Sequence, residues 1–481
     1  MNSASNPPAR SRAELLRAFF FVNLVALQFG IDSTLWLPTV FSYISTITAH
    51  RRVHYYLSLA QLLPSAVQVF VSLLVGPIVA LFTLSLKWSM VVFILLSFVG
   101  NFLYSCAGPF AINNVWALIG GRMLAGLASG SSALAMSYIV SSSSTDERLE
   151  SLSQYRSFAG VAFVIGPVLS IPLTTFSFHI GRFPVDQNNA PTFVSSFIAV
   201  AVALITCCFV RQKRATQVNF LKVIVHNRSE LTGHSKEIWA VPLLLLLLLF
   251  LSAFLMANVF YTMSDLMRSP DHWNLGLTLI SGLQAIVFLF ALIGSLLADS
   301  FRRIIQTSMQ RASSFRRRIH TALDIQSDDD KGSLLTDKLV SEVVLSACSF
   351  LATVLGCILS IISLAVQAHT TGSHAGSVAC FLIACTIMMA AYNIQAATLP
   401  SLYSKCLPAK LRTVLTPWYG ATVALGKLAA PPIIGAIGVS RAHNNGWIAS
   451  QALCIAIAFL AIALQALFLC PLIRAVLRQS R

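Results

Sequence analysis

Apolar segments of about 20 residues recur along almost the whole sequence, separated by polar stretches. A helix of that length crosses the hydrocarbon core of a bilayer and satisfies its own backbone hydrogen bonds where water is absent. Only 10% of the 481 residues are charged, whereas soluble domains carry about a quarter charged residues. The sequence therefore predicts an all-α membrane protein of about 12 transmembrane helices. The expected spans are 19–42, 56–81, 90–106, 115–140, 152–173, 193–210, 241–261, 277–297, 343–366, 378–399, 414–435 and 448–469.

A basic stretch divides these spans into six plus six. We expect an N-terminal tail over 1–18, a first bundle over 19–210, a central linker over 211–240, a second bundle over 241–469 with a loop over 301–340, and a C-terminal tail over 470–481. About 26 of the 33 Lys and Arg residues, among them Arg148, Arg156 and Lys405, lie on the side that holds both tails, the linker and this loop. Basic loops stay in the cytoplasm, so this side is predicted to be cytoplasmic. The net charge of +16 is then explained by loops that face membrane lipids, without a nucleic-acid partner.

A short pattern recurs in the two halves. The fifth expected span contains Ala162, Gly166 and Pro167, and the eleventh contains Gly426, Ala430 and Pro431 in the same spacing. Small residues let helices approach closely, and a proline permits a bend. The repeat indicates two related six-helix bundles, which is typical of transporters built from repeated halves.

Several motifs resemble those of the major facilitator superfamily. The fourth span carries an arginine followed by spaced glycines, the fifth carries Gly-Pro, and the stretch after the eighth span keeps an acid and a basic pair. The residues concerned are Arg122, Gly126 and Gly130; Gly166 and Pro167; and Asp299, Arg302 and Arg303. The region from Arg122 to Gly166 and residues 188–191 are similar to the lysosomal ceroid-lipofuscinosis-associated branch and to the transporter portion of SPX-type vacuolar phosphate proteins. The resemblance implies a monomer that moves a small solute by alternating access, with Asp299, Arg302 and Arg303 in a gating loop and no cofactor.

Three charges inside expected spans are the candidates for substrate binding or proton coupling: Asp32, Arg122 and Lys427. A charge in hydrocarbon is costly, so it usually faces a cavity or a partner. The resemblance implies that Asp32 lines the central cavity, where it could carry a coupling proton. Two cations and one acid favour an anionic or zwitterionic solute. Each of the three could instead serve a structural pairing between helices.

Four further polar residues are expected to line the cavity: Gln28, Tyr392, Asn393 and Gln395. Amide side chains also form ordinary hydrogen bonds between helices, so this alternative stays open for them. The cysteines show no metal-ligand spacing, and no enzyme motif stands out. We therefore expect neither a metal site nor enzymatic activity.

The 301–340 loop contains Asp330, Leu334 and Leu335 in a pattern that resembles an acidic dileucine sorting signal. Such a signal is read by cytoplasmic sorting adaptors, and it favours an endolysosomal or vacuolar membrane over the plasma membrane. The leading hypothesis is thus a secondary transporter coupled to protons through Asp32. An anion channel on the same fold and a non-transporting membrane scaffold or receptor are the alternatives.

Overall fold

A computed structural model of the chain describes residues 12–37, 39–48, 53–108, 112–143, 148–173, 177–181, 183–212, 235–268, 273, 275, 277–311, 330–369, 375–407, 412, 414–439 and 445–480. Within these residues it is helical apart from one small hairpin. Nine helical segments of the described residues, including 115–142, are long and apolar enough to cross a membrane, and two shorter apolar segments of longer helices cover 19–34 and 279–294. The predicted all-helical membrane fold is confirmed.

In the described part of the N-terminal half there are eight helices and the hairpin. Its elements are α1 (Arg12–Thr34), α2 (Val40–Ile47), α3 (Val53–Leu81), α4 (Leu86–Ser105), α5 (Val115–Ala128), α6 (Gly130–Ser142), α7 (Arg148–Leu173), β1 (Phe178–Ile180), β2 (Phe183–Val185) and α8 (Ala190–Phe209). The C-terminal half contains α10 (Ser235–Arg268), α11 (Leu277–Arg311), α13 (Asp330–His369), α14 (Ala375–Cys406), α16 (Trp418–Val439) and α17 (Asn445–Ser480).

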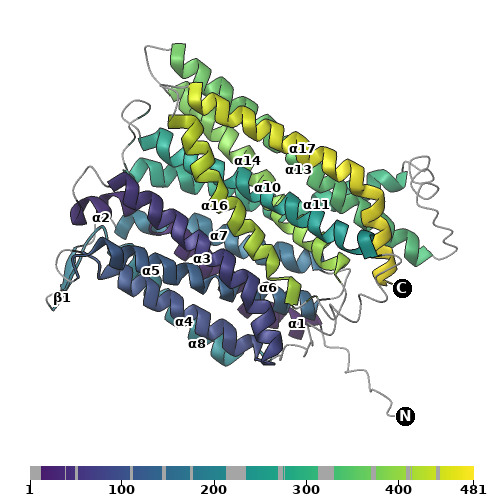
Figure 1. The fold of residues 1–481 in the computed structure, drawn as a ribbon, viewed down its shortest axis with the longest axis horizontal. Coiled ribbons are helices and arrows are strands. Elements are labelled where there is room, and N and C mark those ends of the chain that lie inside the picture. The colour runs from purple at the N-terminus through teal and green to yellow at the C-terminus, as the bar shows by residue number, and fades with distance from the viewer. Residues whose placement is uncertain are drawn as a thin grey trace.

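The two halves lie side by side (Figure 1). They meet mainly where α7 packs against α11 and α3 packs against α16. The antiparallel hairpin pairs Phe178 with Val185 and lies at the end of the molecule opposite the C-terminus (Figure 1). Large apolar side chains on the outer helices are exposed, for example Phe70 at 66% and Leu467 at 73%. Such a surface suits hydrocarbon and would be unstable in water.

Two of the expected continuous spans are broken. The first is interrupted between α1 and α2, where the sequence places Pro38; a proline lacks an N–H group and disfavours helical backbone in the residue before it. The fourth is divided at Ser129 into α5 and α6. Ser131 donates its hydroxyl to the carbonyl of Ala128 there, so the side chain replaces backbone pairing at the break.

The expected 301–340 loop is shorter than predicted at both ends. Helix α11 continues to Arg311, so Asp299, Arg302 and Arg303 lie on a helix and not in the predicted loop. Their gating role stays a prediction. Helix α13 begins at Asp330, so the dileucine residues Leu334 and Leu335 also lie on a helix. The helices extend beyond the apolar runs because the flanking segments contain Arg, Lys, Gln and Leu, which are good helix formers.

Predicted packing glycines lie at close helix contacts. A methyl group on Gly126 would come within 2.5 Å of the carbonyl oxygen of Pro64 in α3. One on Gly166 would collide with the side chain of Thr34 in α1. Pro167 lies inside α7 and Pro431 inside α16, and Gly130 packs against the Phe93 ring. The small residues therefore set the spacing between helices of the first half.

Candidate transport site

A buried carboxylate forms the centre of a polar network in the N-terminal half. Asp32 lies near the end of α1, and its side chain is 6% exposed. Its Oδ2 atom accepts a hydrogen bond from Ser97 Oγ at 2.7 Å, and its Oδ1 atom accepts one from Asn101 Nδ2 at 2.7 Å and one from Ser195 Oγ at 3.3 Å. Helices α4 and α8 thus supply three neutral donors, which stabilise an ionised carboxylate away from water.

The same carboxylate faces a buried cation. Arg122 Nη1 lies 3.9 Å from Asp32 Oδ1, and the Arg122 side chain is 7% exposed. The guanidinium carbon lies 4.0 Å from the centroid of the Trp36 ring. Arg122 Nε and Nη1 are buried without a hydrogen-bond acceptor among the described residues. The arginine therefore depends on the Asp32 charge and the Trp36 ring more than on hydrogen bonds.

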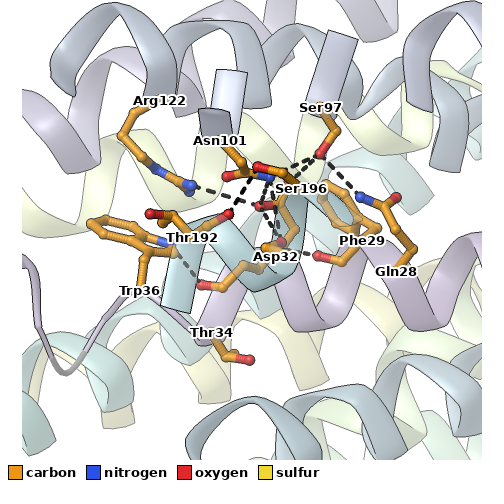
Figure 2. A network of polar contacts seen from close by, with 12 residues as sticks. Gln28, Phe29, Asp32, Thr34, Trp36, Ser97, Asn101, Arg122, Thr192 and Ser196 are labelled. Carbon is orange, nitrogen blue, oxygen red and sulfur yellow. Dashed lines mark hydrogen bonds and ion pairs between the residues drawn. The ribbon is translucent and has the colours of Figure 1, made fainter. Parts of the chain in front are cut away.

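Figure 2 shows Arg122 and Trp36 on one side of Asp32, and Ser97 and Gln28 on the other. Gln28 Nε2 donates to Ser97 Oγ at 3.0 Å, so Gln28 extends the network by one residue. This arrangement can hold a negative charge, because the carboxylate has both neutral donors and a cation within reach.

A second group of polar side chains lies where the two halves meet. A cavity of about 50 Å³ is lined by residues of α1, α3, α6 and α7 from one half and of α10, α14 and α16 from the other. Lys427 and Tyr392 line it. Arg156, which the charge distribution assigned to a cytoplasmic stretch, also lines it. The volume suffices for a few water molecules, so a solute of metabolite size enters only when the halves separate.

The structure thus divides the three predicted charges between two places. Asp32 and Arg122 lie together inside the N-terminal half, and Lys427 lies at the interface with Arg156. Asp32 is not among the residues that line the interface cavity. The prediction of one shared cavity for all three is therefore corrected, because the carboxylate faces α4 and α8 of its own half.

Three of the four expected lining residues form hydrogen bonds between helices. Gln28 donates to Ser97, Asn393 Nδ2 donates to the carbonyl of Ala291 at 3.0 Å, and Gln395 Oε1 accepts from Ser252. None of the three lines the interface cavity. For these amides the alternative interpretation holds, since a buried amide needs several partners.

A third polar cluster lies at the predicted cytoplasmic end, and it corrects the assignment of two basic residues to aqueous stretches. Lys405, in the last turn of α14, is 5% exposed and pairs with Glu342 of α13 at 2.5 Å. Arg148, in the first turn of α7, is 1% exposed, and its Nη1 donates to the carbonyl of Ser404 at 3.4 Å. This last bond joins the two halves. Counting cations by loop could not reveal it, because positively charged residues at helix ends can be buried by the opposite half.

Comparisons with known proteins agree with this architecture. The family model of the Major Facilitator Superfamily matches residues 18–315. The chain is 27% identical over 433 residues to the MFS-type transporter PUL3 of Kluyveromyces lactis, covering 89% of this chain and 92% of that protein. It is also 27% identical over 300 residues to the uncharacterized membrane protein YNR062C of Saccharomyces cerevisiae, covering 60% of this chain and 87% of that one.

Solved structures show the same fold. FucP in the outward conformation superposes with a TM-score of 0.61 at 15% identity, covering 94% of this chain and 99% of that one. The proton:xylose symporter XylE superposes with a TM-score of 0.64 at 14% identity, covering 95% and 96%. With its family model matched over more than half of its length, the chain belongs to the Major Facilitator Superfamily and is an integral, multi-pass membrane transporter rather than an enzyme.

Proposed function

We propose that this secondary transporter moves a small anionic or zwitterionic solute through the cavity between its halves, and that Asp32 couples this movement to protons. The observation that carries the coupling is the Asp32–Arg122 pair at 3.9 Å, buried in the first half. The cavity supports the solute path because both halves line it. Rocking of the halves would expose such a cavity to each side in turn.

Protonation of Asp32 would change the energetics of its neighbours. The neutral acid would leave Arg122 as a buried cation over the Trp36 ring, with no hydrogen-bond acceptor for Nε and Nη1 among the described residues. An uncompensated buried charge costs several kcal/mol, so the protonated protein would favour a conformation in which Arg122 reaches water or another acceptor. A proton would in this way bias the equilibrium between conformations, as any ligand with unequal affinity for two states does.

Proton coupling is tested in proteoliposomes that contain a pH-sensitive dye. Solutes from a panel of carboxylates and amino acids are added outside, and both solute uptake and lumenal pH are recorded. In the wild type we expect solute uptake to carry protons. Asp32→Asn should keep exchange of solute for solute and lose accumulation driven by a pH gradient.

Glu150→Gln is the matched control, because it also removes one carboxylate. Glu150 lies in the first turn of α7 and does not line the cavity. This variant should behave as the wild type. If Asp32→Asn still accumulates solute in response to a pH gradient, while folding normally, Asp32 has no part in coupling.

The endolysosomal or vacuolar location is a separate proposal. It rests on the similarity of residues 188–191 to the lysosomal branch and on the pattern of Asp330, Leu334 and Leu335. Sorting adaptors would read the pattern on the first turns of α13. Replacing both leucines by alanine should move a fluorescently tagged protein to the plasma membrane, and an unchanged distribution would refute the signal.

A further inference from the structure

Two positively charged side chains from opposite halves line the interface cavity. Arg156 belongs to α7 of the first half, and Lys427 belongs to α16 of the second. Because both side chains line one small cavity, their like charges repel each other. The Arg156 guanidinium lies over the ring of Tyr419, 5.0 Å from its centroid, and Tyr419 also belongs to α16. Both cations are therefore held at the surface along which the halves separate.

The cavity supplies no negative charge of its own. No aspartate or glutamate occurs among the residues that line it in the described part of the chain. Asp32, the buried acid of the first half, is occupied by Arg122 and three neutral donors. Two like charges enclosed in a medium of low dielectric constant raise the energy of the closed form unless an anion lies between them.

Other groups in the cavity suit a particular kind of anion. Ser72 Oγ, Ser129 Oγ and the Tyr419 hydroxyl are buried without hydrogen-bond partners among the described residues, and all three residues line the cavity. Aromatic and thioether side chains, including Phe163 and Met256, complete the lining. Hydroxyl donors suit carboxylate oxygens, and the apolar groups suit a planar or aliphatic body.

From these contacts we infer that Arg156 and Lys427 together form the binding site for the carboxylate of a small organic anion with an apolar body. The inference rests on the proposed transport through this cavity and names the class of solute. A bound carboxylate joins α7 to α16, so it removes the repulsion that opposes closure. Arg156 and Lys427 are then the residues through which the solute lets the two halves come together.

The test measures binding to the purified full-length protein in lipid nanodiscs. The probes are carboxylates, each paired with its neutral amide: benzoate with benzamide, indole-3-acetate with indole-3-acetamide, and hexanoate with hexanamide. Dissociation constants come from titrations at constant ionic strength. We expect at least one carboxylate to bind about tenfold or more tightly than its amide, as the loss of one charge-assisted contact implies.

Variants assign this preference to the two cations. Arg156→Gln and Lys427→Gln should each weaken carboxylate binding about tenfold or more, and Lys427→Arg should retain most of it. Lys87→Gln is the matched control, because it also removes one cation. Lys87 lies over the Trp88 ring and does not line the cavity. The affinity of this variant for carboxylates should equal that of the wild type. Circular dichroism and size-exclusion profiles confirm that each variant is folded.

Two results would overturn the inference. One is the absence of a carboxylate preference in all three pairs, and the other is a preference that survives both glutamine substitutions. Neither result removes the proposed transport function, because uptake of a zwitterionic solute through the same cavity would remain measurable in proteoliposomes. Loss of all solute flux in the wild type would instead refute the proposed function.

Discussion

In the Asp32–Arg122 pair, Arg122 should depend on its partner for stability more than Asp32 does. Asp32 accepts three hydrogen bonds from neutral donors, whereas two of the three guanidinium nitrogens of Arg122 have no acceptor among the described residues. At a separation of 3.9 Å, the Coulomb attraction is about 4 kcal/mol at an effective dielectric constant of about 20. Removing the carboxylate charge therefore isolates Arg122, while removing Arg122 leaves a carboxylate that is still well solvated by the protein.

The two single substitutions should consequently differ in cost. Asp32→Asn should lower the free energy of unfolding by about 3–5 kcal/mol, the usual result of leaving a buried charge unpaired. Arg122→Gln should lower it by about 1–3 kcal/mol, since the carboxylate keeps its neutral donors. The double variant should be close to Arg122→Gln alone, so the coupling energy should equal the cost of Asp32→Asn, about 3–5 kcal/mol.

These values are measured by unfolding the purified protein in mixed micelles with increasing denaturing detergent. Ser97→Ala is the reference substitution for the loss of one neutral hydrogen-bond donor, and it should lower the free energy of unfolding by about 1 kcal/mol. The reasoning is refuted if Arg122→Gln is more damaging than Asp32→Asn. It is also refuted if the effects of the two substitutions simply add, because an additive pair shares no stabilising interaction.

Three other substitutions test the contacts at the predicted cytoplasmic end. Glu342→Gln should lower the free energy of unfolding by about 3–5 kcal/mol in the same micelle assay, because Lys405 is left buried and unpaired; an unchanged value would show that Lys405 reaches water. Gly76→Ala should cost about 1–3 kcal/mol through overpacking, because a Cβ atom would collide with the carbonyl of Val414 across the interface; normal stability would show that the halves adjust freely. Arg148→Gln should speed amide hydrogen exchange at the start of α7 through loss of its bond to the opposite half, and exchange rates equal to the wild type would contradict that role.

The fold could be predicted from the sequence because hydrocarbon imposes strong limits on length and polarity. The apolar runs located the helices that cross the bilayer. Helix breaks were harder to predict: a proline marked the first, but the second depends on how Ser131 bonds within its own turn. The extensions of α11 and α13 beyond the apolar runs were also not predicted, because hydropathy identifies apolar segments and does not detect a polar helix.

The site could be predicted in part. Asp32 and Arg122 stand out as charges inside apolar segments, but their pairing depends on the rotation of α1 against α4 and α5, which a single sequence does not specify. Arg156 was overlooked because it was grouped with Arg148 as a basic residue near a loop. Its place four residues inside the fifth expected span was the signal that could have identified it. Glu342 was missed because it lies one residue before the ninth expected span, where it looks like part of the preceding loop.

Helices α1 and α7 connect the charged network to the interface cavity. On α1, Phe29 lines the cavity while Asp32, three residues further on, holds the network. A methyl group on Gly30 would come within 3.0 Å of the carbonyl of Ala159, so the backbones of α1 and α7 lie in close contact. Arg156 is one turn before Ala159 on the same face of α7. A shift of α1 caused by protonation of Asp32 would therefore displace Arg156, because two closely packed backbones cannot move independently. Proton binding and solute binding would in this way act on one pair of helices without sharing a residue.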